Sequence, residues 1–188
     1  MDTRAGSGRH GIEFTNGSND NLVTNNRIAF NTGDGVDVTD QNSTGNSILS
    51  NSIFGHGGTA IDLGLNGRTL NDGGDGDEGG NDILNFPVIE SAIGSAGAVT
   101  ITITLDVPDG PYVVEYFANP GGAAGSLHGE GEVFLGSRPI SNVVQGEMYL
   151  QTIPASPGDI ITATITEGTL ASPGSTSEFA RRLSLIHI

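Results

Sequence analysis

Five acidic side chains lie between Asn71 and Asp82, in a segment that contains five glycines and no basic residue. The acids are Asp72, Asp75, Asp77, Glu78 and Asp82. Calcium takes about six to eight oxygen ligands, and glycines let the backbone approach an ion closely. The segment does not follow the EF-hand loop, however, because Gly79 stands where a pattern starting at Asp75 needs Asp or Asn. It is therefore either a calcium site or a flexible, solvated acidic linker.

A second set of acids recurs along the first third of the chain. The segments GIEFT, GVDVT and AIDLG are 24 and 25 residues apart, and their central acids are Glu13, Asp37 and Asp62. In a strand, each acid would point to the opposite face from its apolar neighbours. If the segments stack about 4.8 Å apart, the acids form an outward column that could hold a metal or perform acid–base chemistry. We expect a solvated acidic face instead, since neighbouring carboxylates repel by only about 1 kcal/mol in water.

The scaffold that would stack these acids is a solenoid. A repeat of this length is typical of solenoid proteins, and short β-branched segments separated by Asn and Gly favour strands over helices. The pattern predicts a right-handed parallel β-helix with about three rungs, one per repeat, over residues 1–67. Stacking would align four apolar columns inside it: Ile12/Val36/Ile61, Phe14/Val38/Leu63, Val23/Ile48 and Ile28/Ile53. Asn26 would lie over Asn51, so that their side-chain amides form a ladder at a bend.

The open ends of such a solenoid need caps that cover its core. The first eight residues, MDTRAGSG, are short and polar and would cover the first rung poorly. We therefore expect further rungs before this chain, so that one partner is the rest of its own longer chain.

The second half of the sequence has a different periodicity. From Pro87 onwards, short alternating segments such as AVTITITLD (98–106) are separated by turn signals such as PDG. Seven such segments, the last of them Ser175–Arg182, predict an antiparallel, immunoglobulin-like β-sandwich over residues 87–182. Residues 68–86, which contain the acidic segment, would be the connector between the halves. The predicted fold class is thus all-β.

Several motifs keep a common order along both halves. They are AIDLG (60–64), NDGGDGDEGGNDILNFPV (71–88), YVVEYFAN (112–119), GEGEVFLG (129–136), ITAT (161–164) and TSEF (176–179). In this order and spacing they resemble the C-terminal part of bacterial secreted right-handed β-helix proteins of the pectate-lyase-like superfamily. The resemblance implies terminal β-helix rungs, a Gly/Asp-rich connector and an immunoglobulin-like module. It also implies a secreted or cell-surface location.

The composition restricts the choice of partners. The formal net charge is −15, from 22 acids against seven bases, all of them Arg. This charge repels phosphate backbones and anionic membranes, so we expect no nucleic-acid partner, and cations are natural ligands. The absence of Cys excludes disulfides, cysteine-ligated zinc and cysteine nucleophiles. No apolar run is long enough to span a membrane, and no signal-peptide pattern begins the chain, so an export signal would lie upstream.

The last six residues, LSLIHI (183–188), do not resemble the preceding sequence. They match, codon by codon, the translation of a transposase adapter used in sequencing libraries. We therefore interpret residues 183–188 as an adapter-derived tail and leave them out of the predicted fold.

Two functions remain open for this predicted fold. One is a non-catalytic module of an exported protein that binds polysaccharide or another cell-surface component. The other is a lyase or hydrolase of acidic polysaccharide, with Glu13, Asp37 and Asp62 at a groove and part of its site in upstream rungs.

The basic residues favour the module over the enzyme. A lyase of this kind pairs its carboxylates with a basic side chain, but Arg27 falls opposite Ser52 in the stack, so no basic column forms. His10 and His56 border the rungs, and isolated histidines of this kind are more typical of surface positions than of catalysts. We therefore expect a binding or structural module.

Overall fold

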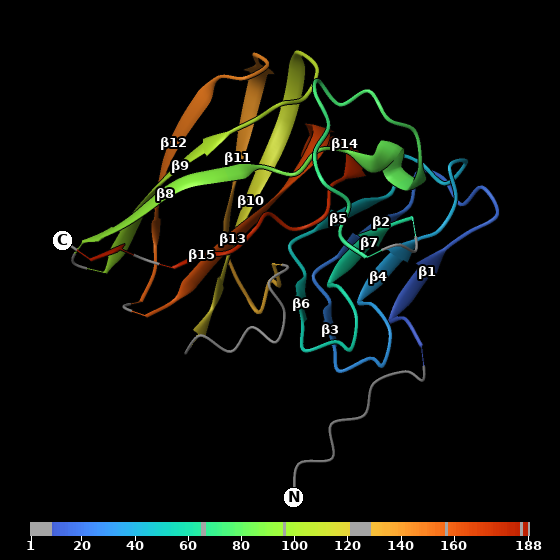
Figure 1. Cartoon of the computed structure of the whole chain (residues 1–188), viewed down its shortest axis with the longest axis horizontal. Helices are drawn as coiled ribbons and strands as arrows, with labels where there is room; N and C mark the ends of the chain where they lie inside the picture. The colour runs from blue at the N-terminus through green and yellow to red at the C-terminus, as the bar shows by residue number, and fades with distance from the viewer. Residues whose placement is uncertain are drawn as a thin grey trace, which may run out of the picture.

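The computed structural model describes residues 9–64, 67–95, 97–120, 129–156, 158–184 and 186–187. The described chain is all-β, with parallel sheets in its first part and mainly antiparallel sheets in its second (Figure 1). One short 3₁₀ helix, η1 (Gly80–Ile83), lies between the two parts of the described chain. We call residues 9–64 the repeat half, residues 67–87 the connector and residues 88–187 the two-sheet half. No helix in the described ranges is long and apolar enough to cross a membrane.

The repeat half consists of three parallel sheets built from three-residue strands. The first sheet contains β1 (Ile12–Phe14), β4 (Val36–Val38) and β7 (Ile61–Leu63). The second pairs β2 (Leu22–Thr24) with β5 (Ser47–Leu49), and the third pairs β3 (Arg27–Ala29) with β6 (Ser52–Phe54). The strand register follows the sequence repeat in all three sheets, so the predicted columns are confirmed. The first sheet contains three described repeats, and each of the others contains two.

Apolar side chains from all three parallel sheets meet in one core. Val38, Ile53 and Leu63 are almost fully buried in it. Phe117 and Phe179 of the two-sheet half belong to the same cluster, and their rings pack edge to face. The repeat half therefore completes its core with side chains from the other half.

Asparagine side chains connect successive repeats at the bends. Asn26 donates from its backbone N–H and its side chain to Oδ1 of Asn51, at 2.9 and 3.2 Å. Asn51 donates in turn to the carbonyl of Val23 at 2.8 Å. This is the predicted ladder. A second asparagine ladder, which was not predicted from the sequence, joins Asn21 to Asn46 at 2.9 Å.

The two-sheet half contains two sheets that share a hydrophobic core. One sheet has the order β11 (Val133–Val143), β10 (Gly110–Asn119), β13 (Ile160–Thr169) and β14 (Ser172–Thr176). The other has the order β12 (Met148–Pro154), β9 (Ala98–Thr104) and β8 (Val88–Ser95). Within these two strand orders, each strand is antiparallel to its neighbours. The alternation of the sequence is clearest in β9, where Val99, Ile101 and Ile103 are buried.

Two segments near the C-terminus differ from the sequence prediction. The last predicted strand ends early, because β14 stops at Thr176 while Glu178 and Phe179 turn toward the repeat half. The short strands β15 (Leu183–Ser184) and β16 (Ile186–His187) pair with β13 and β8, so the tail that the prediction left out takes part in both sheets.

Strand β10 is buried on both of its faces. Tyr112, Val114 and Tyr116 belong to the core between the two antiparallel sheets. Glu115 and Phe117 lie on the opposite face and contact the repeat half. The two halves are therefore joined across a sheet face as well as through the connector.

Candidate functional site

The strands β5, β6 and β7 meet the two-sheet half and the connector instead of a further repeat. Within the repeat half, N–H groups donate to carbonyls of the neighbouring repeat, as Ser47 does to Asn21 at 2.8 Å. The N–H groups on the opposite edge donate to side chains. These bonds run from Asn46 to Asn81 Oδ1, Ile48 to Thr176 Oγ1, Ser50 to Glu115 Oε2, Gly55 to Glu130 Oε1 and Leu63 to Glu178 Oε1, at 2.8–3.1 Å. We call these five bonds the edge contacts.

A backbone pair adds to the edge contacts. Ile53 and Gly131 exchange both N–H···O bonds at 2.8 Å as an isolated antiparallel bridge. A Cβ atom at Gly131 would lie 2.7 Å from the ring of Phe179 and 2.8 Å from that of Phe117. Glycine is therefore needed for the two backbones to approach so closely.

Three of the five acceptors in the edge contacts are buried glutamates. Glu115, Glu130 and Glu178 are at most 4% exposed. Burial raises the pKa of Glu115 to about 7 and that of Glu178 to about 8, although hydrogen bonds from Ser50 and Leu63 oppose the shift. Burial also raises the pKa of Glu130. The three glutamates accept strong hydrogen bonds from the edge N–H groups, but burying them costs free energy because they lose their water.

These roles were not predicted from the sequence. Glu115, Glu130 and Glu178 lie in the motifs YVVEYFAN, GEGEVFLG and TSEF, which carry the family resemblance. The signal that could have revealed Glu115 is that Val113 and Phe117, which share its face of the strand, are also apolar, so that both faces of the strand are apolar. An acid at such a position is seldom buried unless it has partners.

The connector brings three of the five predicted calcium ligands together. Carboxylate oxygens of Asp72, Asp75 and Asp77 lie within 4.8 Å of one another. Asp75 accepts the backbone N–H of Asn85 at 2.7 Å, and burial raises its pKa to about 6. Oδ1 of Asp77 is buried, and no described residue donates a hydrogen bond to it. Three converging carboxylates with an oxygen in need of a partner fit part of a calcium ligand set.

The other two predicted calcium ligands are placed elsewhere. Glu78 is exposed and lies outside the group of converging acids. Asp82 also lies outside it, and its Oδ2 accepts a hydrogen bond from Ser175 at 3.1 Å. The spacing in the sequence identified the acidic segment but not which of its acids converge.

Amide side chains fix the connector to both halves. Asn81, in η1, donates to the carbonyl of Asn46 at 2.7 Å and adds a third member to the second asparagine ladder. Asn85 donates to the carbonyls of Asp72 and Asp106 at 3.0 and 2.8 Å. A connector bonded in this way differs from the flexible linker that the sequence left open.

The predicted acidic column forms in the first parallel sheet. Glu13 pairs with Asp37, and Asp37 with Asp62, in the parallel register. Glu13 is exposed, but Asp37 and Asp62 are only 0% and 3% exposed, so the solvated face expected there is wrong for these two acids. Asp62 accepts the N–H of Gly67 at 3.0 Å. Burial raises the pKa of Asp37 to about 7, an effect that His10 opposes and Asp62 reinforces.

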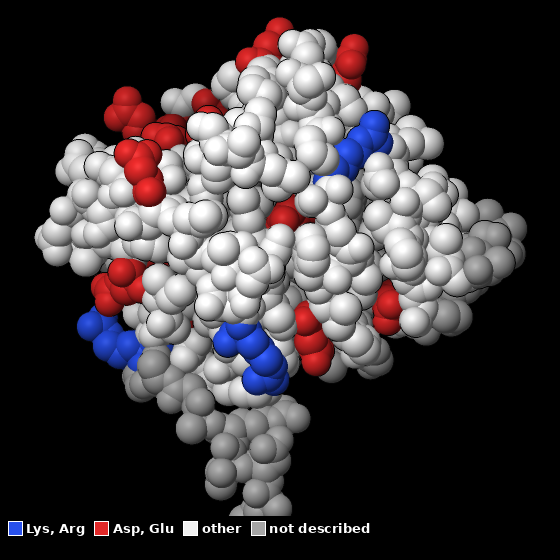
Figure 2. Space-filling view, turned by 180° about the vertical axis from the view of Figure 1, so that it is seen from behind, with Lys and Arg blue, Asp and Glu red and all other residues white. Residues whose placement is uncertain are grey.

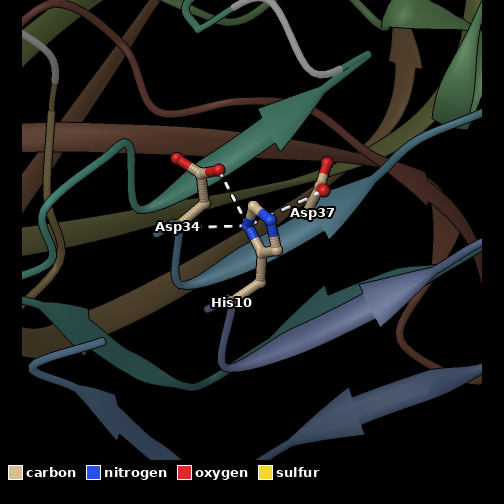
Figure 3. Close-up of side chains that lie close together, drawn as sticks. All are labelled: His10, Asp34 and Asp37. Atoms are coloured by element: carbon tan, nitrogen blue, oxygen red, sulfur yellow. Dashed lines mark hydrogen bonds and ion pairs between the residues drawn. The ribbon is translucent and has the colours of Figure 1, made fainter. Parts of the chain in front are cut away.

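His10 and Asp34 extend this column into a cluster. They precede β1 and β4, and Figure 3 shows their side chains converging with that of Asp37. Nδ1 of His10 lies 2.9 Å from Oδ2 of Asp34 and 3.7 Å from Oδ2 of Asp37.

His56, the other histidine beside the repeats, lies outside this cluster. It accepts the N–H of Asn31 at 3.3 Å, and burial lowers its pKa. Both histidines are partly buried rather than on the open surface.

No protein-family model matches the chain, and no curated protein matches it in sequence. The function is therefore inferred from the edge contacts, the connector and the side-chain clusters.

The buried glutamates predict that the protein becomes less stable as the pH rises. The folded pKa values of about 7 and about 8 lie above the ordinary value of 4.5 for Glu115 and Glu178. The folded protein therefore binds these protons more tightly than the unfolded chain does, and the free energy of unfolding falls between about pH 5 and about pH 8. Thermal melts across this range measure the trend. Glu115→Gln should lessen it, because the amide can keep both bonds to Ser50 without a charge.

Glu147→Gln is the matched control, since Glu147 is exposed. The expected pKa shift would be contradicted by a Glu115→Gln variant whose melting temperature falls with pH as steeply as that of the unchanged protein.

Proposed function

We propose that this chain is a non-catalytic structural and surface-binding module of an exported bacterial protein. In this proposal the repeat half is the end of a right-handed parallel β-helix, and the two-sheet half is an immunoglobulin-like β-sandwich that caps it. The sequence motifs and the parallel register over 24 and 25 residues support the β-helix assignment. The observation that carries the proposal is the set of edge contacts.

The edge contacts supply what the terminal rung of a β-helix needs. An open sheet edge invites pairing with other chains and leaves N–H groups without acceptors. Here Asn, Thr and Glu side chains accept these bonds, while Phe117 and Phe179 extend the apolar core. The burial of Asp37 and Asp62 also favours a structural role, because a polysaccharide chain could not reach these acids.

Removing two edge carboxylates tests the capping role. In Glu115→Ala/Glu178→Ala, the N–H groups of Ser50 and Leu63 lose their acceptors, at a cost of about 1–3 kcal/mol each. We expect the unchanged protein to melt in one transition and the double variant to melt in two, with the repeat half unfolding first. Differential scanning calorimetry measures both profiles. Glu147→Ala serves as the control, and a double variant that melts like the control would exclude the capping role.

We also propose that calcium binds in the connector, at Asp72, Asp75 and Asp77. The convergence of their oxygens and the buried Oδ1 of Asp77 support this site. Calcium would offset the repulsion among the three carboxylates and stiffen the segment that leads into η1. Such an ion is plentiful outside cells, which agrees with the proposed location.

Calorimetric titration should detect calcium binding, and thermal melts should show that calcium raises the melting temperature. Both effects should disappear in Asp72→Asn/Asp75→Asn/Asp77→Asn, because amides carry no charge and bind calcium weakly. Glu78→Gln should bind calcium normally, since Glu78 lies outside the group. No heat of binding and no change in the melting temperature would mean that the acids are only solvated.

The proposed surface ligand is an acidic polysaccharide. Three of the seven arginines, Arg68, Arg181 and Arg182, line one cleft of about 500 Å³ with Phe86 and Val88. The guanidinium of Arg68 lies 4.1 Å from the centre of the Phe86 ring. Guanidinium groups beside apolar side chains fit the carboxylate and the apolar face of a uronic acid unit.

The distribution of charge supports a local site of this kind. On the face drawn in Figure 2, acidic side chains lie at several separate places, and the basic ones form no continuous stripe. A stripe would be needed to follow a phosphate backbone. A cleft with a few converging arginines is suited instead to single carboxylate groups along a sugar chain.

We expect polygalacturonate to bind more tightly than a neutral glucan, with an affinity that falls as the salt concentration rises. Arg68→Gln/Arg181→Gln should weaken this binding at least about tenfold, because a charge-assisted hydrogen bond contributes about 1.5–3 kcal/mol. Arg27→Gln/Arg138→Gln, in β3 and β11, is the control of equal charge change. Isothermal titration calorimetry measures all three proteins. Equal affinity for the two polysaccharides, or a double variant that binds like the control, would contradict an acidic ligand in the cleft.

A further inference from the structure

The cluster of His10, Asp34 and Asp37 belongs to the first two repeats and shares no residue with the edge contacts or the connector. Its three side chains come from positions just before β1, just before β4 and within β4. One ligand atom from each lies within 4.8 Å of the other two. Figure 3 shows the imidazole ring of His10 between the two carboxyl groups.

Asp37 is the member of the cluster that most needs a partner. Its side chain is 0% exposed, and no described residue donates a hydrogen bond to either of its oxygens. Leaving a buried carboxyl group without such bonds is costly. Its charged surroundings include three other acids, Asp62, Asp34 and Glu13, against the single imidazole of His10. An acidic pocket of this kind attracts a cation.

The distances within the cluster fit ligands of one ion. Two atoms that are each about 2.1 Å from a metal and at right angles lie about 3 Å apart, and a wider ligand angle gives about 3.6 Å. The corresponding distances from His10 Nδ1 are 2.9 Å to Asp34 and 3.7 Å to Asp37. A nitrogen and a carboxylate oxygen at 2.9 Å need a proton or a metal between them, because their lone pairs otherwise repel.

We propose that His10 Nδ1, Asp34 Oδ2 and an oxygen of Asp37 bind a divalent transition-metal ion such as Mn²⁺ or Zn²⁺. Imidazole nitrogen is a ligand for these ions, whereas Ca²⁺ and Mg²⁺ prefer oxygen ligands alone. Since the side chains of His10 and Asp34 are each 12% exposed, water can reach the site and complete the coordination.

The surroundings of Asp34 suit it to this role. Its Oδ1 accepts hydrogen bonds from the N–H and the hydroxyl of Thr59, at 2.6 and 3.1 Å. These bonds orient the carboxyl group so that Oδ2 faces His10, as outer-shell partners do for metal ligands. The N–H of Asp34 also lies 3.2 Å from His10 Nδ1, and metal binding exchanges this hydrogen bond for a coordinate bond. The ion would then join the first repeat to the second and stabilise the start of the stack.

Titration of the full chain, freed of metals by a chelator, tests this site with Mn²⁺, Zn²⁺ and Ca²⁺ as separate probes. We expect one equivalent of Mn²⁺ or Zn²⁺ to bind and to raise the melting temperature, in preference to Ca²⁺ at this site. His10→Gln and Asp37→Asn should each weaken the binding at least about tenfold. Both replacements are polar and of similar size, so that folding can be checked by a normal circular dichroism spectrum.

Two further proteins locate the bound ion. Glu13→Gln lies in the same column but outside the ligand set, and it should bind Mn²⁺ and Zn²⁺ like the unchanged protein. The connector variant Asp72→Asn/Asp75→Asn/Asp77→Asn should also retain this binding. The proposal is overturned if the unchanged protein binds neither ion, or if a folded His10→Gln variant binds them with unchanged affinity. It is also overturned if binding disappears in the connector variant alone.

Discussion

The edge of a stack of parallel sheets is the constraint on which the rest of this structure depends. Each edge strand presents backbone N–H and C=O groups that have no partner within its own sheet. Inside the repeat half, the next repeat supplies the partners at a constant spacing along the sequence. At β5, β6 and β7 and at the residues beside them, side chains of the two-sheet half and the connector supply the partners instead, together with the backbone of Gly131. This requirement places carboxylates where burial alone would disfavour them.

Carboxylates suit the edge because one group can accept two hydrogen bonds. Glu178 accepts the N–H groups of Leu63 and Thr69, and Glu115 accepts both the N–H and the hydroxyl of Ser50. Charged acceptors form stronger hydrogen bonds than neutral ones, but the water that they lose on burial opposes this gain. The same burial that shields these bonds also raises the pKa values, so the strength of the junction is linked to proton binding.

Stacking has a second consequence, which is the accumulation of like charge. Equivalent positions of successive repeats lie one above another, so the acids of the first sheet form a column whose last two members are buried. The acidic segment of the connector adds another concentration of negative charge. Cations are the general means of offsetting such charge. The two proposed sites differ in chemistry, because the connector offers oxygen atoms and the cluster at the start of the stack adds an imidazole nitrogen.

The sequence by itself determined the features that depend on a short or repeated pattern. The 24- and 25-residue repeat predicted the register of β1, β4 and β7, since stacking equivalent positions aligns their apolar side chains. Strict alternation predicted β9, because successive side chains of a strand point to opposite faces. Only the tertiary structure decided which acids are buried and what they contact. Glu115 and Ser50 are 65 residues apart, and Glu178 and Leu63 are 115 apart, so no local pattern links them. Burial depends on what packs against a strand, and in this protein another half of the chain does so.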